Sequence, residues 1–259
     1  MSIQITTEQV KELRDATGIS VMQCKRALEE AEGDMNKALA ILKKTSSDIA
    51  LKKMSREIKA GSVSIKTSGK KAVLVSLGCE TDFVAKNEDF TTLLEKLTDK
   101  ALAEGAEKMK AEAKDIIDPI IQKTGENIQL GDVYEVVGDV LGNYVHNNKI
   151  GIIVSLEGGN TELAKDIAMH IAAMKPEYIS KEEISEDIKK TMQEVFEKEV
   201  ASIDKPEEIK KKMLDGKMAT YFKEKTLLDQ AFIKDGNITI SQLLDKSKAK
   251  IKEVKRYSI

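Results

Sequence analysis

Histidine and cysteine supply much of the acid–base, nucleophilic and metal-binding chemistry of proteins, and this sequence has only two residues of each type. His146 and His170 stand in neither an HExxH motif nor another paired-ligand spacing. Cys24 and Cys79 lie far apart with no CxxC pair, so neither a zinc site nor a disulfide framework is indicated. We expect both cysteines to pack as small apolar side chains. A GxSxG nucleophile elbow is also absent from the sequence.

The segment Ser64–Lys71 (SIKTSGKK) superficially resembles a phosphate-binding loop. That motif requires glycine at its first position and serine or threonine at its last, but position 64 is serine and position 71 is lysine. Gly69 also opens no helix whose N-terminus could receive a phosphate. We therefore expect no catalytic residue, no metal ligand, no cofactor and no direct nucleotide binding.

The most informative short segment is Thr81–Val84, of sequence TDFV. Thr81 or Asp82 can cap a following helix, which places Phe83 on its first turn. Only ten aromatic residues occur in the chain, five Phe and five Tyr, and aromatic side chains dominate binding hot spots. Phe83 has two interpretations: an exposed anchor for a pocket of a partner, or a staple that packs under its own helix.

The segment Thr81–Val84 lies within an internal sequence repeat with a spacing of 79 residues, and the elements of this repeat position it. Val75–Leu77 matches Val154–Leu156, and Asp82-Phe83 corresponds to Thr161-Glu162, so the repeated fold itself does not require an aromatic residue there. Each copy begins with the period-two pattern of a β-hairpin and continues into a helix. The predicted turns are Thr67–Gly69 and His146–Lys149, and the predicted helices are Asn87–Leu102 and Thr161–Met174.

The repeat predicts an α+β fold in which each half is a small antiparallel sheet with helices on one face. Capping-box spacings from Thr6 to Gln9 and from Ser20 to Gln23 predict a module of three short helices before it. After it, helical periodicity interrupted at Asp204–Pro206 predicts a helical hairpin, and Ile238–Ile240 is a candidate short strand. The predicted division is 1–44 three-helix module, 45–60 linker that is partly helical, 61–138 core subdomain N, 139–179 with 226–259 core subdomain C, and 180–225 coiled-coil hairpin.

Composition and charge narrow the functional classes further. The 259 residues include 42 Lys and Arg against 44 Asp and Glu, a net charge of −2, which disfavours a dedicated nucleic-acid binder. The hydrophobic fraction is 41%, yet no apolar run approaches the roughly 18 residues that cross a bilayer. The first residues also lack the pattern of a signal peptide. We therefore expect a soluble, cytoplasmic protein that binds neither nucleic acid nor membrane.

Several blocks, in their order along the chain, resemble the elongation factor Ts family, the guanine-nucleotide exchange partners of elongation factor Tu. The strongest block is Thr81–Asn87 (TDFVAKN) after Gly78–Glu80. The supporting blocks are Val10–Arg14 with Thr17-Gly18, Met22–Leu28, Gly125–Asn127, Gly138–Val140 and His170–Pro176. The resemblance implies a ubiquitin-associated-like N-terminal module, two related core subdomains and an inserted coiled-coil hairpin.

The resemblance also implies a function and a set of contact residues. A member binds elongation factor Tu·GDP and promotes release of GDP and Mg²⁺ so that GTP can bind, with no chemistry of its own. The resemblance assigns the contact that displaces Mg²⁺ to Thr81, Asp82, Phe83 and Val84. It places a second contact on the N-terminal module at Arg14, Met22 and Lys25, and a weaker one at His170.

Two other classes of function remain as alternatives. A ubiquitin-associated-like adaptor would bind a partner through residues 1–44 alone, indifferent to nucleotide. An enzyme would turn over a small substrate, and the missing nucleophile, metal and cofactor motifs disfavour it. RNA binding ranks last because of the net charge.

Overall fold

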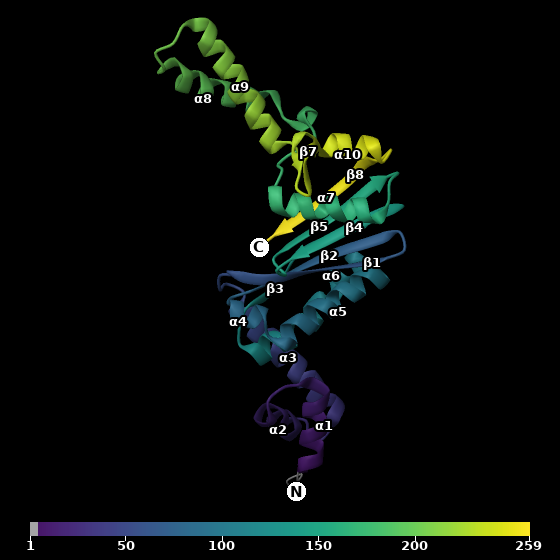
Figure 1. Cartoon of the computed structure of the whole chain (residues 1–259). Coiled ribbons are helices and arrows are strands. Elements are labelled where there is room, and N and C mark those ends of the chain that lie inside the picture. The colour runs from purple at the N-terminus through teal and green to yellow at the C-terminus, as the bar shows by residue number, and fades with distance from the viewer. Residues whose placement is uncertain (1–4) are drawn as a thin grey trace. The chain divides into compact units, whose positions relative to one another are not determined.

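The computed structural model describes residues 5–259, so residues 1–4 of the predicted N-terminal module lie outside the described residues (Figure 1). The fold is a mixture of helices and small antiparallel sheets. Contacts divide the chain into two compact units. The first unit comprises the chain up to Val137 with Val145–Gly151 and Lys255–Ile259, and the second comprises Gly138–Tyr144 and Ile152–Val254. The five-part division expected above stays a prediction.

The first unit begins with three helices: α1 (Thr7–Thr17), α2 (Val21–Glu30) and α3 (Met35–Lys53). The predicted caps are present, because the Gln9 N–H donates to Thr6 Oγ1 and the Gln23 N–H donates to Ser20 Oγ. Gly18, with φ of 68°, ends α1 in the left-handed conformation that glycine adopts without strain. The helices share a small core made of Val10, Leu13, Ile19, Cys24, Ala27, Leu28, Ala31, Ala38 and Leu42.

Helix α3 runs through most of the predicted linker, which confirms that this segment is partly helical. It packs against α6 (Ala106–Thr124). Ser47 Oγ donates to Asp118 Oδ2 (2.7 Å), and Lys43 Nζ pairs with Asp115 Oδ2 (2.6 Å). The three-helix module is therefore tied to the following sheet by a helix and not by a flexible segment.

The sheet of the first unit has the strand order β1-β2-β3, with β1 (Ala60–Ser68), β2 (Lys71–Cys79) and β3 (Ile128–Val137) antiparallel. The predicted hairpin is confirmed, but its turn lies at Gly69-Lys70, slightly later than expected. Helices α5 (Glu88–Glu104) and α6 pack with the sheet around a core that includes Phe90, Leu77 and Met109. Strand β3 and helix α6 were not predicted from the sequence.

A second sheet has the order β4-β5-β8, from β4 (Val140–His146), β5 (Ile150–Glu157) and β8 (Lys250–Ser258). The predicted turn is confirmed: Asn147 and Asn148 have φ of 50° and 56°, the left-handed conformation of a tight hairpin turn. Helix α7 (Thr161–Met174) has the predicted bounds. It lies so close to β4 that a Cβ on Gly142 would come within 2.2 Å of its backbone at Ala164.

The remaining elements of the second unit are α8 (Glu186–Ala201), α9 (Glu207–Lys225), β6 (Ala231–Phe232), β7 (Asp235–Thr239) and α10 (Ile240–Lys246), with single 3-10 turns at Lys181–Glu183 and Leu227–Asp229. The short strand expected at Ile238–Ile240 was partly wrong, because β7 pairs with β6 in its own two-stranded sheet and Ile240 already begins α10.

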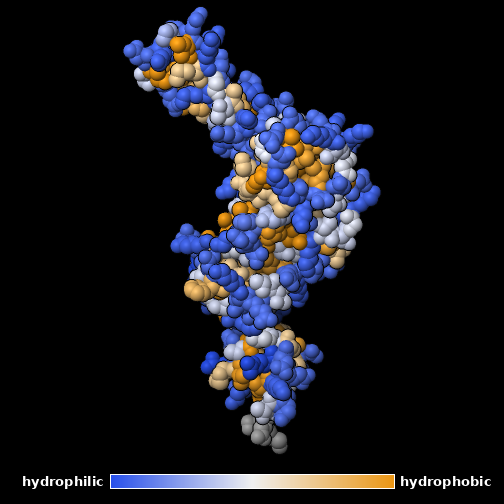
Figure 2. Space-filling view, viewed as in Figure 1, coloured by the Kyte–Doolittle hydropathy of each residue, from blue (hydrophilic) through white to orange (hydrophobic). Residues whose placement is uncertain are grey.

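Helices α8 and α9 form the predicted helical hairpin, with the break at the expected place. Lys217 pairs with Glu199 (2.7 Å), and the Phe196 and Tyr221 rings meet edge to face with centroids 6.0 Å apart. Figure 2 shows apolar side chains at the surface of this hairpin, at the top of the view; Val195 and Ile209 are 42% and 44% exposed. None of the helices in the described part of the chain is long and apolar enough to cross a membrane.

Candidate functional site

The segment that was singled out by sequence forms a sharp corner between β2 and α5. Helix α4 (Asp82–Ala85) is only four residues long. Thr81 is its N-cap, with Oγ1 accepting from the Val84 N–H (3.3 Å). Lys86 is the C-cap of α4, and Asn87 is the N-cap of α5, with Oδ1 accepting from the Asp89 N–H (2.8 Å). The chain thus makes one isolated turn of helix before α5.

Phe83 lies on this isolated turn. Its side chain is 89% exposed, more than any other large apolar side chain in residues 5–259. Its neighbours on α4 are anchored, since Ala85 is buried and Val84 packs against the core. The interpretation of Phe83 as an exposed side chain is therefore confirmed, and the staple interpretation is wrong. The ring of Phe83 therefore buries little of its surface within its own fold.

The corner is braced from the segment between α6 and β3. The Thr81 N–H and Oγ1 both donate to the Glu126 carboxylate, at 3.0 and 2.7 Å. The Asn127 N–H donates to Glu80 Oε1 (2.6 Å), and this bond is the main cause that lowers the pKa of Glu80 below its usual range. Because charge-assisted hydrogen bonds are the stronger kind, the backbone that carries Phe83 is held in place by contacts within the chain.

Asp82 has an ion-pair partner from far along the chain. Lys149 Nζ lies 3.0 Å from Asp82 Oδ1, with the two side chains 46% and 57% exposed. The hydrogen bond from Lys149, with its charge, lowers the pKa of Asp82. The corner therefore presents an ionised carboxylate next to an exposed phenyl ring at neutral pH.

Cys79 lies directly under the corner, but it is not activated for chemistry. Its side chain is buried and its Sγ lies 3.2 Å from the Thr81 carbonyl oxygen. Burial, reinforced by the charge of Glu126, raises the pKa of the Cys79 thiol to about 11. A thiol that stays protonated at neutral pH is a poor nucleophile. Within the described range, no group of three or more His, Cys, Asp or Glu side chains is arranged to hold a metal ion.

The three residues predicted on the N-terminal module are all at its surface. Arg14 lies in the last turn of α1. Met22 is 59% exposed, and Lys25, one turn further along α2, pairs with Glu29 over 3.8 Å. Met22 and Lys25 are three residues apart on one helix, so they share a face. Nothing in the structure brings them together with the corner.

His170 is placed differently, since it is fully buried in α7. The Ile233 N–H donates to its Nδ1 (3.2 Å), so the proton resides on Nε2, which donates to Gln230 Oε1 (2.9 Å). Burial lowers the pKa of His170, and the bond to Gln230 opposes that effect. In the free chain both ring nitrogens are therefore occupied within the protein.

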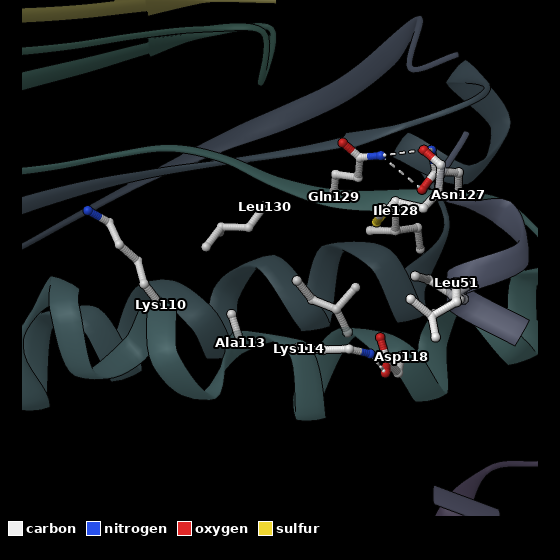
Figure 3. Close-up of a pocket in the computed structure, with 13 residues that line it drawn as sticks. Leu51, Lys110, Ala113, Lys114, Asp118, Asn127, Ile128, Gln129 and Leu130 are labelled. Carbon is white, nitrogen blue, oxygen red and sulfur yellow. Dashed lines mark hydrogen bonds and ion pairs between the residues drawn. The ribbon is translucent and has the colours of Figure 1, made fainter. Parts of the chain in front are cut away.

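A separate groove of about 370 Å³ lies between the end of α3, helix α6 and the start of β3 (Figure 3). Its walls are mainly apolar, and its charged side chains are paired, Lys114 with Asp118 and Lys110 with Glu107. Gln129 Nε2 donates to the Met54 carbonyl oxygen (3.2 Å) and to Asn127 Oδ1 (3.3 Å). The groove holds no pair of groups that could act as nucleophile and base.

Sequence reasoning did not assign a role at the corner to Glu126 or Lys149. Glu126 stands within one of the blocks that carried the family resemblance, Gly125–Asn127, and Lys149 ends a predicted turn. They reach the corner from 45 and 67 residues away in the chain. Such pairings carry no local periodicity, so only the folded structure reveals them.

Fold and corner define a mixed α/β protein with small antiparallel sheets and an exposed aromatic residue on a braced turn. The family model described as "Elongation factor TS" matches residues 80–259. Proteins named Elongation factor Ts are 40% identical in Hahella chejuensis (98% of this chain, 92% of that protein), 39% in Pseudomonas fluorescens (99% and 91%) and 37% in Aeromonas hydrophila (98% and 90%). The chain belongs to the elongation factor Ts family and hence to the translation elongation factors.

Proposed function

We propose that this chain is a guanine-nucleotide exchange factor that binds elongation factor Tu·GDP and promotes release of GDP and Mg²⁺, so that GTP can bind. The observation that carries the proposal is the 89% exposed ring of Phe83 on a turn braced by Glu126. Family membership supplies the partner. The chain contributes binding energy and no bond-making chemistry of its own.

Thermodynamics sets what the contact must supply. Coupling between two ligands is reciprocal, so a factor that weakens GDP binding must itself bind the nucleotide-free partner more tightly than the GDP-bound partner. A shift of ten-thousandfold corresponds to about 5.5 kcal/mol. Burying one Phe side chain contributes about 1.5–3 kcal/mol. The ring of Phe83 alone is too small for this task, and a second contact must share it.

At the corner, we assign different tasks to the four residues. Phe83 inserts between elements that hold the phosphate loop of the partner, and Asp82 competes for the hydrogen bonds around its Mg²⁺. Thr81 and Val84 set the geometry, because Thr81 caps α4 and is bonded to Glu126 while Val84 packs against the core. Their effect on exchange runs through the position of Phe83.

The second contact in this proposal is the N-terminal module, a ubiquitin-associated-like domain formed by α1–α3. Exposed Arg14, Met22 and Lys25 face the nucleotide-binding domain of the partner. The continuous helix α3 and its hydrogen bond from Ser47 to Asp118 of α6 connect this module to the sheet. We propose that α8 and α9 act as a coiled-coil hairpin that reaches another part of the partner.

His170 requires an indirect role. Its ring is buried and bonded on both nitrogens, so it acts on a partner contact by holding the segment from Gln230 to Ile233. A direct contact would require one of these two bonds to break first.

The test is stopped-flow release of a fluorescent GDP from elongation factor Tu, with the wild-type chain, Phe83→Ala and the control Val137→Ala. Val137 is also exposed, at 60%, but lies on β3. We expect strong acceleration by wild type and by the control, and a loss of about tenfold or more for Phe83→Ala. Stability should change by less than about 0.5 kcal/mol in either variant, because both side chains are exposed.

Two results would contradict the proposal. If the wild-type chain binds the partner without accelerating GDP release, and GDP does not weaken the complex, the adaptor function replaces exchange. If Phe83→Ala matches wild type, the corner is not the contact that drives exchange, and the N-terminal module takes its place.

A further inference from the structure

Lys149 is the residue that connects the second hairpin to the corner. It ends the β4–β5 turn, which belongs to the same compact unit as the corner. Its Nζ donates to Asp82 Oδ1 (3.0 Å) across 67 residues of chain. The proposed exchange function gives Asp82 a task but does not use Lys149.

The backbone of the turn is itself fixed in place. The Val63 N–H on β1 donates to the Asn148 carbonyl oxygen (2.7 Å). The Ile259 N–H donates to the Lys149 carbonyl oxygen (3.0 Å). Asn147 and Asn148 adopt the left-handed conformation that makes the turn tight. Lys149 thus projects from an anchored backbone, unlike a lysine on a mobile loop.

Lys149 is the cation that interacts most strongly with Asp82. Lys149 supplies the hydrogen bond and the larger charge effect that lower the pKa of Asp82, and Lys86 adds a smaller charge effect from the end of α4. The ammonium group of Lys149 has three donors, of which Asp82 uses one. Asp82 therefore leaves two donors of this ammonium group unused.

We propose that Lys149 is a positioning residue for Asp82 during nucleotide exchange, an inference that rests on the function proposed above. A lone carboxylate approaching bound phosphates is repelled, and stripping water from it is costly. With Lys149 attached, Asp82 enters the interface as a neutral pair whose oxygen is already aimed. An exposed ion pair contributes little to the free chain, but a charge pair enclosed at an interface couples strongly. The effect of Lys149 therefore appears in exchange and not in stability.

The test compares Lys149→Met, Lys149→Gln and Lys149→Arg in the full chain, with Lys66→Met as the matched control. Lys66 pairs with Asp99 over 2.5 Å in the same unit, away from the corner. We expect the maximal GDP-release rate to fall about tenfold or more for Lys149→Met and Lys149→Gln, which is the lower end of the coupling between close charge pairs at interfaces. Lys149→Arg should restore most of the rate, and the control should match wild type. The concentration for half-maximal acceleration and the thermal midpoint should change little.

A double-mutant cycle separates positioning from any general charge effect. In an Asp82→Asn background, Lys149→Met should cause no further loss. Equal losses in both backgrounds, or a Lys149→Met rate equal to wild type, would overturn the inference while leaving the exchange function intact. Failure of the wild-type chain to accelerate release would instead reject the exchange function, and this inference with it.

Discussion

The corner after β2 and the corner after β5 begin with the same kind of N-cap but continue into different helices. In the first, Thr81 accepts from the Val84 N–H; in the second, Asn160 accepts from the Leu163 N–H (2.9 Å). The two caps are related by the 79-residue repeat. After the second cap, α7 continues for 14 residues, whereas α4 ends after four residues and a new helix, α5, starts at Glu88.

The surroundings of the two corners differ as well. In the second, Gly158 and Gly159 have φ of 77° and 70°, and a Cβ on Gly158 would come within 2.3 Å of the Lys248 carbonyl oxygen. The second corner is therefore covered by the backbone near Lys248. The first corner has no such cover at Phe83, which is 89% exposed. Since one repeat folds with Thr161-Glu162 where the other has Asp82-Phe83, the repeated fold does not require an aromatic side chain at this position.

The largest expected effect comes from making the first corner like the second. Asp82→Thr combined with Phe83→Glu gives it the two residues of the second. We expect the chain to remain folded with an unchanged thermal midpoint, because both positions are at the surface. Acceleration of GDP release from elongation factor Tu should fall about a hundredfold or more, since the ring and the carboxylate are both lost. Stopped-flow release and circular dichroism on the same sample provide the two measurements.

The reciprocal change is the control. Thr161→Asp with Glu162→Phe places the same pair on the second corner, and exchange by this variant should equal that of wild type. If the first double variant retains wild-type exchange, the difference between the corners has no functional meaning.

An intermediate effect is expected from the brace. Glu126→Ala removes the acceptor of both Thr81 donors, and hydrogen bonds to a charged group contribute roughly 1.5–3 kcal/mol to stability. We expect a loss of stability of that order and a fall in the maximal exchange rate of about tenfold, because Phe83 is no longer held in one orientation. Urea unfolding and stopped-flow release measure the two losses.

The matched variant on the second corner is Asn160→Ala. It removes an N-cap, which costs about 1 kcal/mol of stability, and exchange by the folded protein should remain at the wild-type rate. Equal losses of exchange in both variants would mean that general destabilisation, and not the orientation of the corner, limits the rate.

The comparison of the two corners also shows which elements can be predicted from the sequence. Local periodicity and the repeat were sufficient for both hairpins, for α7 and for the cap at Thr81. Strands β3 and β8 were missed. Strand β3 pairs with β2 although three helices, α4, α5 and α6, lie between them in the chain, and the pairing is irregular opposite Ser76. Strand β8 contains many charged residues, so it lacks a clear alternation of apolar and polar side chains. Glu126 and Lys149 were missed as corner residues for the same reason. Their roles arise from pairings set by tertiary packing, which local patterns do not encode.

The smallest expected effect concerns pH, and it too distinguishes the two halves. In the 79-residue repeat, the position of His170 in the second half corresponds to Thr91 in the first half, and threonine does not titrate. Burial lowers the pKa of His170 from its ordinary value of 6.5 in the folded chain. The folded state therefore favours neutral His170, whose Nδ1 accepts from the Ile233 N–H. Its contribution to stability is complete above pH 6.5 and is lost as the pH falls from there through the folded-state pKa.

Urea unfolding from pH 7.5 to 5 should show this as a difference between wild type and His170→Gln. A single group can change the free energy of unfolding by at most about 1.4 kcal/mol per pH unit, so wild type should be steeper by less than that amount. If His170→Gln retains the full wild-type slope, the pH dependence of the chain comes from its carboxylates. The buried contact between α7 and the Gln230–Ile233 segment would then not be its source.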